Sequence, residues 1–280
     1  MKTILITGGT EGTGKGIAMY FLKKGDRVVV IGSSAEKGNH FYNEAKSLGL
    51  EDRAIFIQAN LSLVKENHRV IKEIRERFDA LDLLILCAST QKYRENYLET
   101  EDGLEFTFAL NYLSRHILSF GLKELLEKGA NPVIMNVCAP GMKGTVKWED
   151  LQYKENFNSD KAKFHGSRLN DLLGVYFNQK DSVKKIKYIL FNPWAVQSPA
   201  ALNVYDNPFK NRMIKVVYKI IGKPVDKAII PMIQLLENPP KMSLSAFKQE
   251  KEVDLTMETY NKGNAKRLFH ITSDLLENIQ

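Results

Sequence analysis

The feature that most restricts the fold is an apolar strand that runs directly into a glycine-rich turn and then into a helix. The run Thr3–Thr7 is followed by the sequence GGTEGTG at positions 8 to 14, and a helical pattern begins there. We expect Gly8 to permit the tight turn, Gly12 to let the backbone approach a pyrophosphate, and Gly14 to allow close packing of helix on strand. The pyrophosphate would lie at the positive N-terminal end of the helix, so the segment predicts a dinucleotide site.

Beyond this turn, β-rich runs alternate with helical stretches. The β-rich runs are nearly continuous in Val, Ile and Leu, as expected of strands that helices cover on both faces. This alternation predicts an α/β fold with a doubly wound parallel sheet, the Rossmann fold. The expected strands are Thr3–Thr7, Arg27–Ile31, Ala54–Gln58, Leu81–Leu86, Val133–Val137 and Lys187–Phe191. The expected helices are Gly14–Lys24, Ala35–Leu48, Leu63–Phe78, Glu101–Glu127 and one that starts near Lys161, followed by a less regular C-terminal part.

Neither a repeat nor a low-complexity linker divides the chain, so we expect a single domain over residues 1–280. Residues 1–136 would hold the dinucleotide and residues 137–280 the active site and the substrate, with a helical lid at about 200–223. With two cysteines, a disulfide scaffold is excluded, and the absence of a signal-peptide pattern favours a cytoplasmic protein. The His and Cys spacings suggest no metal site.

The net charge of +7 allows an anionic partner, but the basic residues are spread along the chain. We interpret the one local cluster, Lys184, Lys185 and Lys187, as a solvated face and expect no nucleic acid to bind. Within the expected lid, Asn207–Ile221 carries apolar residues at helical spacing. We expect it to cover a hydrophobic pocket. The alternatives are packing on the protein's own core or on a partner subunit, as in a homodimer, and contact with a membrane, which is the least favoured.

The residues after the second strand bear on the choice between NAD and NADP. An NAD site places Asp or Glu there to bind the ribose hydroxyls, whereas this chain has Ser33 and Ser34. We expect Lys15 and Lys37 to lie nearby, and Glu36 comes slightly too late. Two hydroxyls and adjacent lysines suit a 2′-phosphate, so we expect NADP(H) in preference to NAD(H).

The segment TGGTEGTG at positions 7 to 14 resembles the TGxxxGxG loop of the short-chain dehydrogenase/reductase superfamily, and the chain looks most like its retinol dehydrogenase-like branch. Further matching stretches include Asn60-Leu61-Ser62, Leu110-Asn111-Tyr112-Leu113, Gly166-Ser167-Arg168-Leu169, Asn192-Pro193 and Val196-Gln197-Ser198. The resemblance implies a nicotinamide cofactor bound by Thr7, Gly8, Thr10, Gly12, Thr13, Gly14, Ser33, Ser34, Asn60, Leu61, Ala88, Arg168, Pro193, Trp194 and Val196.

The positions that carry catalysis in this family depart from its pattern. Ala139 stands at the usual serine, and Phe164 and Arg168 stand at the usual tyrosine and lysine, so Asn111 alone of the tetrad remains. Phe164 has no proton to give, and Ala139 has no side-chain donor. Arg168 could still hold a ribose, but it does not deprotonate and cannot shuttle a proton. We therefore expect ordinary carbonyl reduction to be badly impaired.

Other groups could stand in for the missing ones. Cys138 lies near the expected site as a weak donor or nucleophile, although a small apolar residue at a strand end is the simpler interpretation. Tyr93 could reach the pocket from the loop after the fourth strand. Tyr176 and Lys180 form a Tyr-x-x-x-Lys that we interpret as a chance surface pair. Trp194 stands where the family has glycine and could stack on the nicotinamide or fill its place.

These substitutions leave three functional hypotheses open. The first is an NADP(H)-dependent oxidoreductase of altered chemistry that acts on a hydrophobic carbonyl or conjugated small molecule. Reduction of an activated double bond would fit, because it could take its proton from solvent. The second is a non-catalytic dinucleotide-binding protein, a sensor or a subunit. The third is a lyase, cyclase or isomerase that reuses the pocket without hydride transfer.

Overall fold

A central sheet organises the chain, whose computed structural model describes residues 1–179, 185–202, 204–205 and 207–279. The sheet has eight strands, and two further strands form a small separate pair. The strands of the sheet are β1 (Thr3–Thr7), β2 (Arg27–Gly32), β3 (Ala54–Gln58), β4 (Leu83–Leu86), β5 (Val133–Val137), β6 (Lys187–Asn192), β9 (Leu244–Lys248) and β10 (Lys251–Glu252). The separate pair consists of β7 (Val196–Gln197) and β8 (Lys223–Pro224).

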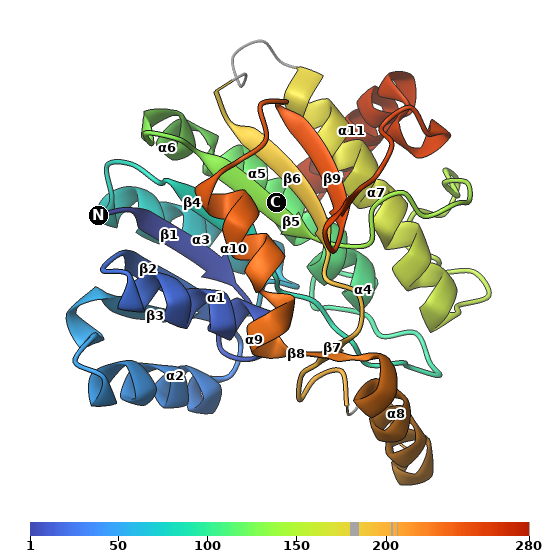
Figure 1. The fold of residues 1–280 in the computed structure, drawn as a ribbon. Coiled ribbons are helices and arrows are strands. Elements are labelled where there is room, and N and C mark those ends of the chain that lie inside the picture. The colour runs from blue at the N-terminus through green and yellow to red at the C-terminus, as the bar shows by residue number, and fades with distance from the viewer. Residues whose placement is uncertain (180–184, 203, 206, 280) are drawn as a thin grey trace.

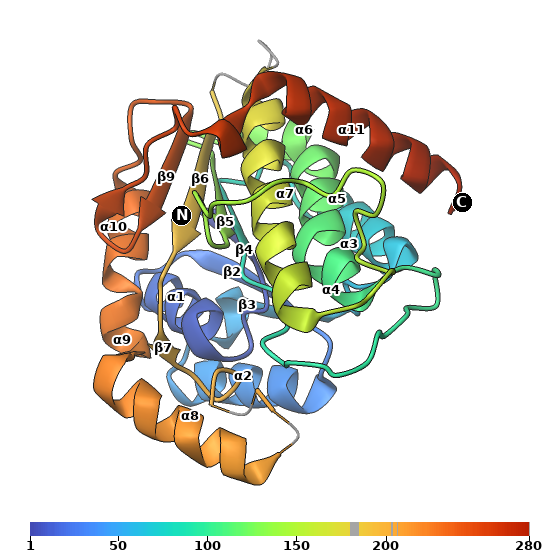
Figure 2. The same cartoon turned by 90° about the vertical axis from the view of Figure 1, so that its right-hand side faces the viewer.

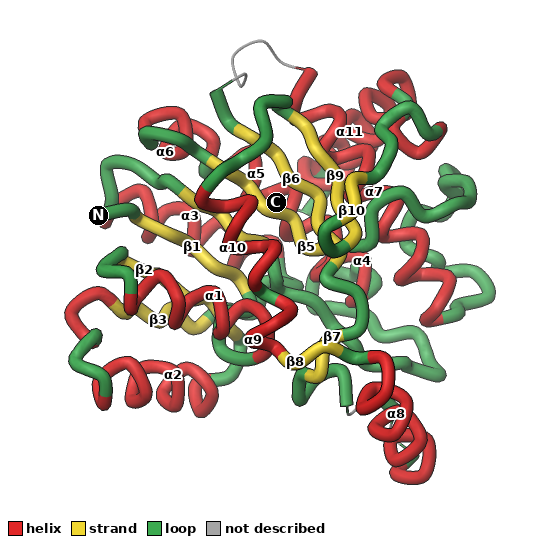
Figure 3. Tube along the Cα trace, viewed as in Figure 1, coloured by secondary structure: helices red, strands yellow, loops and turns green. Residues whose placement is uncertain are grey.

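The order of the strands shows where a ligand would bind. It is β10-β9-β6-β5-β4-β1-β2-β3, and every neighbouring pair is parallel except β10 with β9 (Figure 1, Figure 3). Leu5 of β1 is in register with Val29 of β2 on one side and with Leu84 of β4 on the other. The chain order therefore reverses at β1. Doubly wound sheets bind their ligands at the carboxyl ends of the strands beside such a reversal.

Helices cover both faces of this sheet (Figure 2). The longer helices are α1 (Gly12–Lys23), α2 (Ala35–Ser47), α3 (Val64–Arg77), α5 (Ser114–Gly121), α7 (Ser159–Gln179), α8 (Pro208–Ile221), α10 (Ile230–Glu237) and α11 (Lys262–Glu277). The shorter elements are α4 (Phe106–Phe108), the π-helical turn Ala109–Leu113, α6 (Lys123–Lys128), α9 (Val225–Ala228) and the 3-10 turns Glu51–Arg53 and Glu258–Tyr260.

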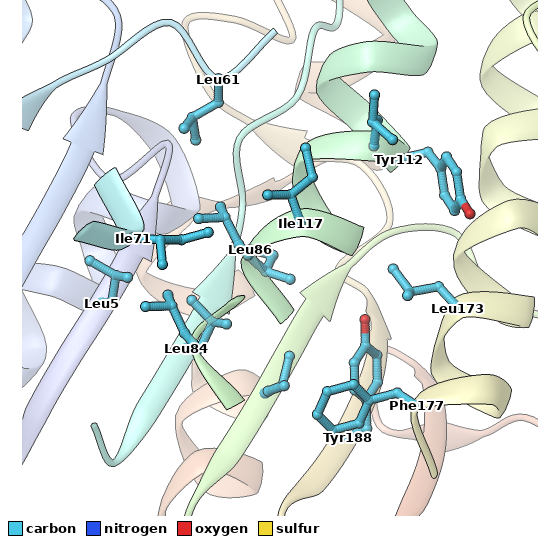
Figure 4. Close-up of a cluster of buried hydrophobic side chains, with 14 of the residues drawn as sticks. Leu5, Leu61, Ile71, Leu84, Leu86, Tyr112, Ile117, Leu173, Phe177 and Tyr188 are labelled. Atoms are coloured by element: carbon cyan, nitrogen blue, oxygen red, sulfur yellow. The ribbon is translucent and has the colours of Figure 1, made fainter. Parts of the chain in front are cut away.

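Two buried hydrophobic clusters hold the helices to the sheet. One includes Leu5 and Leu84 of the strands with Ile117 of α5 and Leu173 of α7 (Figure 4). The other, on the opposite face, joins strand residues such as Ile4 to α1, α2 and α10. Successive side chains of a strand point to opposite faces, so neighbouring residues of β1 belong to different clusters. The nearly continuous apolar strands of the sequence are thus explained by burial on both sides.

The predicted fold class is confirmed, and the expected strands lie within two residues of the observed ones. The single helix expected over Glu101–Glu127 is wrong. A bridge between Glu99 and Glu105 and a left-handed Gly103, with φ of 72°, keep the start of this segment in a loop. The helix begins only after Glu105, whose carboxylate accepts the Phe108 amide at 2.6 Å as an N-cap.

The C-terminal part is also more regular than expected, since it contains α8 to α11 and the strands β9 and β10. The antiparallel β10 is an exception to the parallel sheet that the sequence predicts. In the part of the chain that the structure describes, no helix is both long and apolar enough to span a bilayer. Lys180 and Lys184, named above in a surface pair and a basic cluster, lie outside the described residues.

Candidate active site

The glycine-rich turn lies between the end of β1 and the start of α1, where the chain order of the sheet reverses. Gly8 has a φ of 65°, and a Cβ there would lie 2.8 Å from the Cα of Ala88. A Cβ on Gly14 would press on the carbonyl oxygen of Gly8. No side chain caps the N-terminus of α1, so its first amide groups stay available to an anion. The turn thus forms a cradle that side chains at these two glycines would fill, as a pyrophosphate site requires.

A cavity of about 250 Å³ opens over this turn, and we call it the first cavity. It lies at the carboxyl ends of β1 to β4. Its lining includes most of the residues expected to bind the cofactor, namely Gly8, Thr10, Gly12, Thr13, Ser33, Ser34, Asn60, Leu61 and Ala88. Two expected residues lie behind it. Thr7 accepts the amide of Ala88 at 3.1 Å and so ties the end of β1 to the loop after β4, while Gly14 has the packing role described above.

The cofactor's adenosine end would meet the residues that follow β2. Ser33 and Ser34 line the first cavity together with Lys37, and Ser34 caps α2 by accepting the Lys37 amide at 3.3 Å. The Lys37 ammonium pairs with Glu11 at 2.8 Å. Lys15 does not line this cavity and pairs instead with Glu44 on α2. The hydroxyls and one of the two expected lysines are therefore in place for a 2′-phosphate.

A second cavity, of about 300 Å³, continues from the first. The two share Thr13, Cys87, Ser89, Gln91 and Ser198 in their linings. The second cavity brings together seven residues singled out in the sequence, which are Asn111, Cys138, Ala139, Phe164, Pro193, Trp194 and Val196. The ends of β4, β5 and β6 and one face of α7 supply most of this lining.

Arg168 is not where the sequence places it. It lines neither cavity, and its guanidinium donates to the carbonyl oxygens of Phe164, at 2.6 Å, and Lys143. Gly144 makes room for this arrangement, because a Cβ there would collide with the Arg168 guanidinium. The expectation that Arg168 holds a ribose or takes part in catalysis does not agree with this geometry.

Lys163, one residue before Phe164, is a cavity residue that the sequence analysis missed. Its ammonium donates to the Gln91 carbonyl at 2.8 Å and lies 3.8 Å from the centre of the Tyr93 ring. Burial lowers the pKa of Lys163 to about 8, and nearby Asp160 opposes the shift. Tyr93 does not line the second cavity, since its ring stacks on Tyr205. On this side of the second cavity, the ionisable group that lines the cavity is therefore Lys163 and not Tyr93.

Arg115 is the second cavity residue that the sequence analysis missed. It comes four residues after Asn111 and lies on α5, where it is only 3% exposed. Its guanidinium donates to Asn136 Oδ1 at 2.6 Å and to the Ala88 carbonyl at 3.2 Å. α5 has the sequence SRHILSFG, in which polar and apolar residues alternate irregularly, so the sequence carries no clear signal that Arg115 is buried.

Both cysteines face the second cavity as thiols. Burial raises the pKa of Cys87 to about 12, and it also raises the pKa of Cys138, to which the Asp171 carboxylate adds. A thiol that stays protonated is a poor nucleophile. The geometry therefore favours the simpler interpretation of Cys138 as a small residue at a strand end.

Trp194 adopts a backbone conformation that suits glycine better. Its φ is 63°, its amide donates to Asn192 Oδ1 at 2.8 Å, and its ring is half exposed at the cavity. The Lys248 ammonium lies 3.8 Å from the centre of the ring. A non-glycine residue in the left-handed region is strained. The tryptophan thus keeps the turn of the glycine it replaces while adding an aromatic wall.

The expected lid forms α8, which projects from the body of the molecule (Figure 1). None of its residues is buried, so it does not pack on the protein's own core, one of the alternatives above. Phe209 and Ile220 are 70% and 79% exposed. Tyr218 of α8 and Ala201 before it line the second cavity. Residues 203 and 206 of the expected lid lie outside the described residues.

Comparison with known proteins agrees with this architecture. A family model described as short chain dehydrogenase matches residues 2–150. The chain belongs to the short chain dehydrogenase family. Across nearly its whole length, this short chain dehydrogenase is 24% identical to mouse (Mus musculus) retinol dehydrogenase 12, over 98% of this chain and 86% of that protein.

Other relatives match a shorter part. A hydroxynaphthalene reductase-like protein Arp2 from Metarhizium majus is 31% identical over 144 residues, which are 51% of this chain, so the match spans about half (53%) of that protein's length. A solved structure of a short chain dehydrogenase/reductase family protein superposes with a TM-score of 0.64 at 13% identity, and the match covers 88% of this chain and 94% of that one. This structural likeness supports the fold alone.

Proposed function

We propose that this short chain dehydrogenase is an NADP(H)-dependent oxidoreductase that acts on a hydrophobic conjugated or carbonyl compound by an altered chemistry. The observation that carries the proposal is the continuity of the two cavities. A dinucleotide whose pyrophosphate lies on the glycine turn of the first cavity would extend past the shared Thr13 and Ser198 into the second. When bound, a nicotinamide supplies or accepts a hydride, and the second cavity holds the residues that would meet it.

The preference for NADP(H) rests on the residues after β2. Ser33 and Ser34 line the first cavity, and the first turn of α2 begins there. Hydroxyls and helix amides favour a phosphate over a bare ribose, as does the Lys37 ammonium once a phosphate replaces its partner Glu11, which also lines this cavity. Glu36, the nearest acidic residue in the sequence after β2, does not line the first cavity.

The altered chemistry follows from the side chains that face the second cavity. Phe164 and Ala139 offer no proton and no hydrogen bond to a carbonyl oxygen. Lys163 is the cavity group best suited to hold and release a proton near neutral pH, because its pKa is about 8. When hydride adds to the β-carbon of an unsaturated carbonyl compound, the electron pair moves onto an enolate that can take its proton from solvent, so this reduction depends least on the missing tyrosine.

Part of the wall of this cavity suits a hydrophobic substrate. Phe164 and Trp194 present aromatic rings to it, and the exposed apolar side chains of α8 lie on the segment that leads to Tyr218. The names of two relatives, one for retinol and one for hydroxynaphthalene, also denote apolar conjugated molecules. We extend that substrate class to this chain.

The proposal is tested by binding and then by turnover. Calorimetric titration should show NADPH binding more tightly than NADH. NADPH should then be consumed with hydrophobic unsaturated aldehydes and not with the corresponding saturated aldehydes. Failure of NADPH to bind would overturn the proposal. Binding without turnover of any carbonyl or conjugated compound would instead favour a non-catalytic dinucleotide-binding protein, for which the loss of donors at Ala139 and Phe164 is the supporting observation.

A further inference from the structure

Arg115 is a buried cation at the wall of the second cavity. It is 3% exposed and lies on α5 among other buried residues such as His116 and Ile117. Its two hydrogen-bond partners are both neutral, the side-chain oxygen of Asn136 and the carbonyl oxygen of Ala88. Its Nε has no partner. Of the five N–H groups of the guanidinium, two are therefore used within the protein.

No carboxylate compensates this charge. In residues 1–179, 185–202, 204–205 and 207–279, no Asp or Glu forms an ion pair with Arg115. The ionisable groups whose charge would act on it are Cys138, Tyr188 and Cys87. Burial raises the pKa of each of these, so all three stay neutral near pH 7. A buried charge with no countercharge is costly, and an anion in the cavity would remove that cost.

The guanidinium is held in place by a network of amides. Asn136 Nδ2 donates to Asn170 Oδ1 at 2.8 Å and to the Tyr188 hydroxyl at 3.1 Å. Asn170 in turn donates to the carbonyl oxygens of Asn111 at 2.9 Å and Gly166 at 2.7 Å. The network joins β5, β6, α7 and the π-helical turn beside the cavity. Such fixed surroundings orient the arginine before any ligand arrives.

We infer that Arg115 is a specificity-determining residue that binds a carboxylate carried by the ligand of the second cavity. The planar guanidinium matches a carboxylate, and charge-assisted hydrogen bonds of this kind are among the strongest in proteins. Phe164, Trp194 and Val196 form an apolar part of the cavity wall, and polar side chains such as Thr90, Asn111 and Ser167 line much of the remainder. The ligand class we infer is therefore an acid with an apolar or aromatic part. As a statement about substrate, this rests on the function proposed above; as a statement about binding, it does not need a cofactor.

The test compares two probes of the same shape and different charge. Calorimetry of the full chain without NADPH should show benzoate binding at least about tenfold more tightly than benzamide. Arg115→Met should abolish this difference, and Arg115→Lys should keep part of it. Arg168→Met is the matched control, because Arg168 is also buried but lines neither cavity, and it should behave like the wild type.

Equal affinity for benzoate and benzamide in the wild type would overturn the inference, as would an equal loss in Arg168→Met. Chloride binding as tight as that of benzoate would also overturn it, since the site would then take any small anion. If Arg115→Met does not fold, Arg115→Lys decides the matter, because Lys163 also lines this cavity and a preference for benzoate in the wild type alone would not identify Arg115. Benzoate binding by a protein that does not bind NADPH would leave this inference standing and end the proposed function.

Discussion

The ammonium of Lys163 lies 3.8 Å from the centre of the Tyr93 ring, and it donates to the Gln91 carbonyl at 2.8 Å. This contact joins α7 to the loop after β4 at the edge of the second cavity. The cation–π contact and the hydrogen bond fix the position of the amine. Partial burial then makes it a weaker base than an exposed lysine.

The first prediction concerns the reactivity of Lys163. Because its pKa is about 8, its acylation rate should rise with pH and level off above pH 8, as only the neutral amine reacts. The exposed Lys65, whose hydrogen bond to Glu101 raises its pKa, should continue to gain reactivity up to pH 10. Limited acetylation followed by peptide mass spectrometry measures both residues in one sample. Parallel profiles for the two lysines would contradict the prediction.

The second prediction concerns restored carbonyl reduction. The double variant Ala139→Ser with Phe164→Tyr restores the serine and the tyrosine of the tetrad in the second cavity and should give measurable NADPH-dependent reduction of hydrophobic aldehydes. The gain should be about 10²-fold over the wild type, whereas either single change should do little because the two groups act together.

Family resemblance would also suggest adding Arg168→Lys, but this side chain lines neither cavity. The single variant Arg168→Lys should therefore show no gain, and its addition to the double variant should change little. NADPH consumption with a panel of aldehydes is the measurement. A double variant that binds NADPH and stays inactive, even with Trp194→Gly added, would show that these positions do not meet the substrate.

The third prediction concerns cofactor choice. Ser33→Asp places a carboxylate in the first cavity just after β2, where it would repel a 2′-phosphate and accept ribose hydroxyls. NADPH affinity should fall by about tenfold, and NADH affinity should rise. Ser47→Asp, at the exposed end of α2, is the control and should leave both affinities unchanged. Calorimetric titration of both nucleotides decides, and an unchanged preference in Ser33→Asp would argue against the placement of the phosphate.

The fourth prediction concerns stability and pH. Asp171 is fully buried on α7, and burial raises its pKa to about 7, although it accepts the Gly141 amide and the Thr259 hydroxyl. The folded protein therefore binds a proton at Asp171 that the unfolded chain releases near pH 4. This stabilisation is present at low pH and is lost as pH rises through about 7.

Asp171→Asn removes this titration. Relative to the wild type, its free energy of unfolding should rise with pH by up to about 1.4 kcal/mol per unit between pH 5 and 7, and then stay level. Urea unfolding at several pH values measures the difference. Asp254→Asn is the control, because hydrogen bonds from Thr256 lower the pKa of that exposed carboxyl. If the free energies of unfolding of Asp171→Asn and the wild type differ by the same amount at every pH, Asp171 is ionised throughout this range and the prediction is wrong.

The parts of the molecule that could be predicted from the sequence are those that local patterns determine. The strands follow from buried apolar runs, and the turn after Thr7 follows from glycines whose positions backbone geometry dictates. The placement of Asn111, Ala139 and Phe164 in one cavity was expected from the family resemblance, and the cavity contains all three.

The remainder depends on contacts between distant segments. The spacing of Phe164 and Arg168 predicts that they are neighbours on one helix face. The Arg168 side chain nevertheless turns away from the cavity, because Gly144, which is distant in the sequence, leaves space for its guanidinium. Lys163 and Arg115 lie on helices whose exposed and buried faces become known only once the loop after β4 is in place. Helical periodicity alone does not show which face a cavity opens upon.

Because of the π-helical turn Ala109–Leu113, which leads into α5, the geometry of the second cavity depends on how many residues this helical segment contains. Such a turn is equivalent to a single inserted residue that a helix has absorbed. Asn111 within it accepts the Thr90 amide at 3.2 Å, and Arg115 beyond it holds the Ala88 carbonyl at 3.2 Å. Deleting one residue between Asn111 and Arg115 would rotate one of these side chains about the helix axis by about 100° relative to the other. During evolution, a one-codon deletion at this turn would therefore alter the pocket as thoroughly as replacing a side chain, with every residue of the pocket still present.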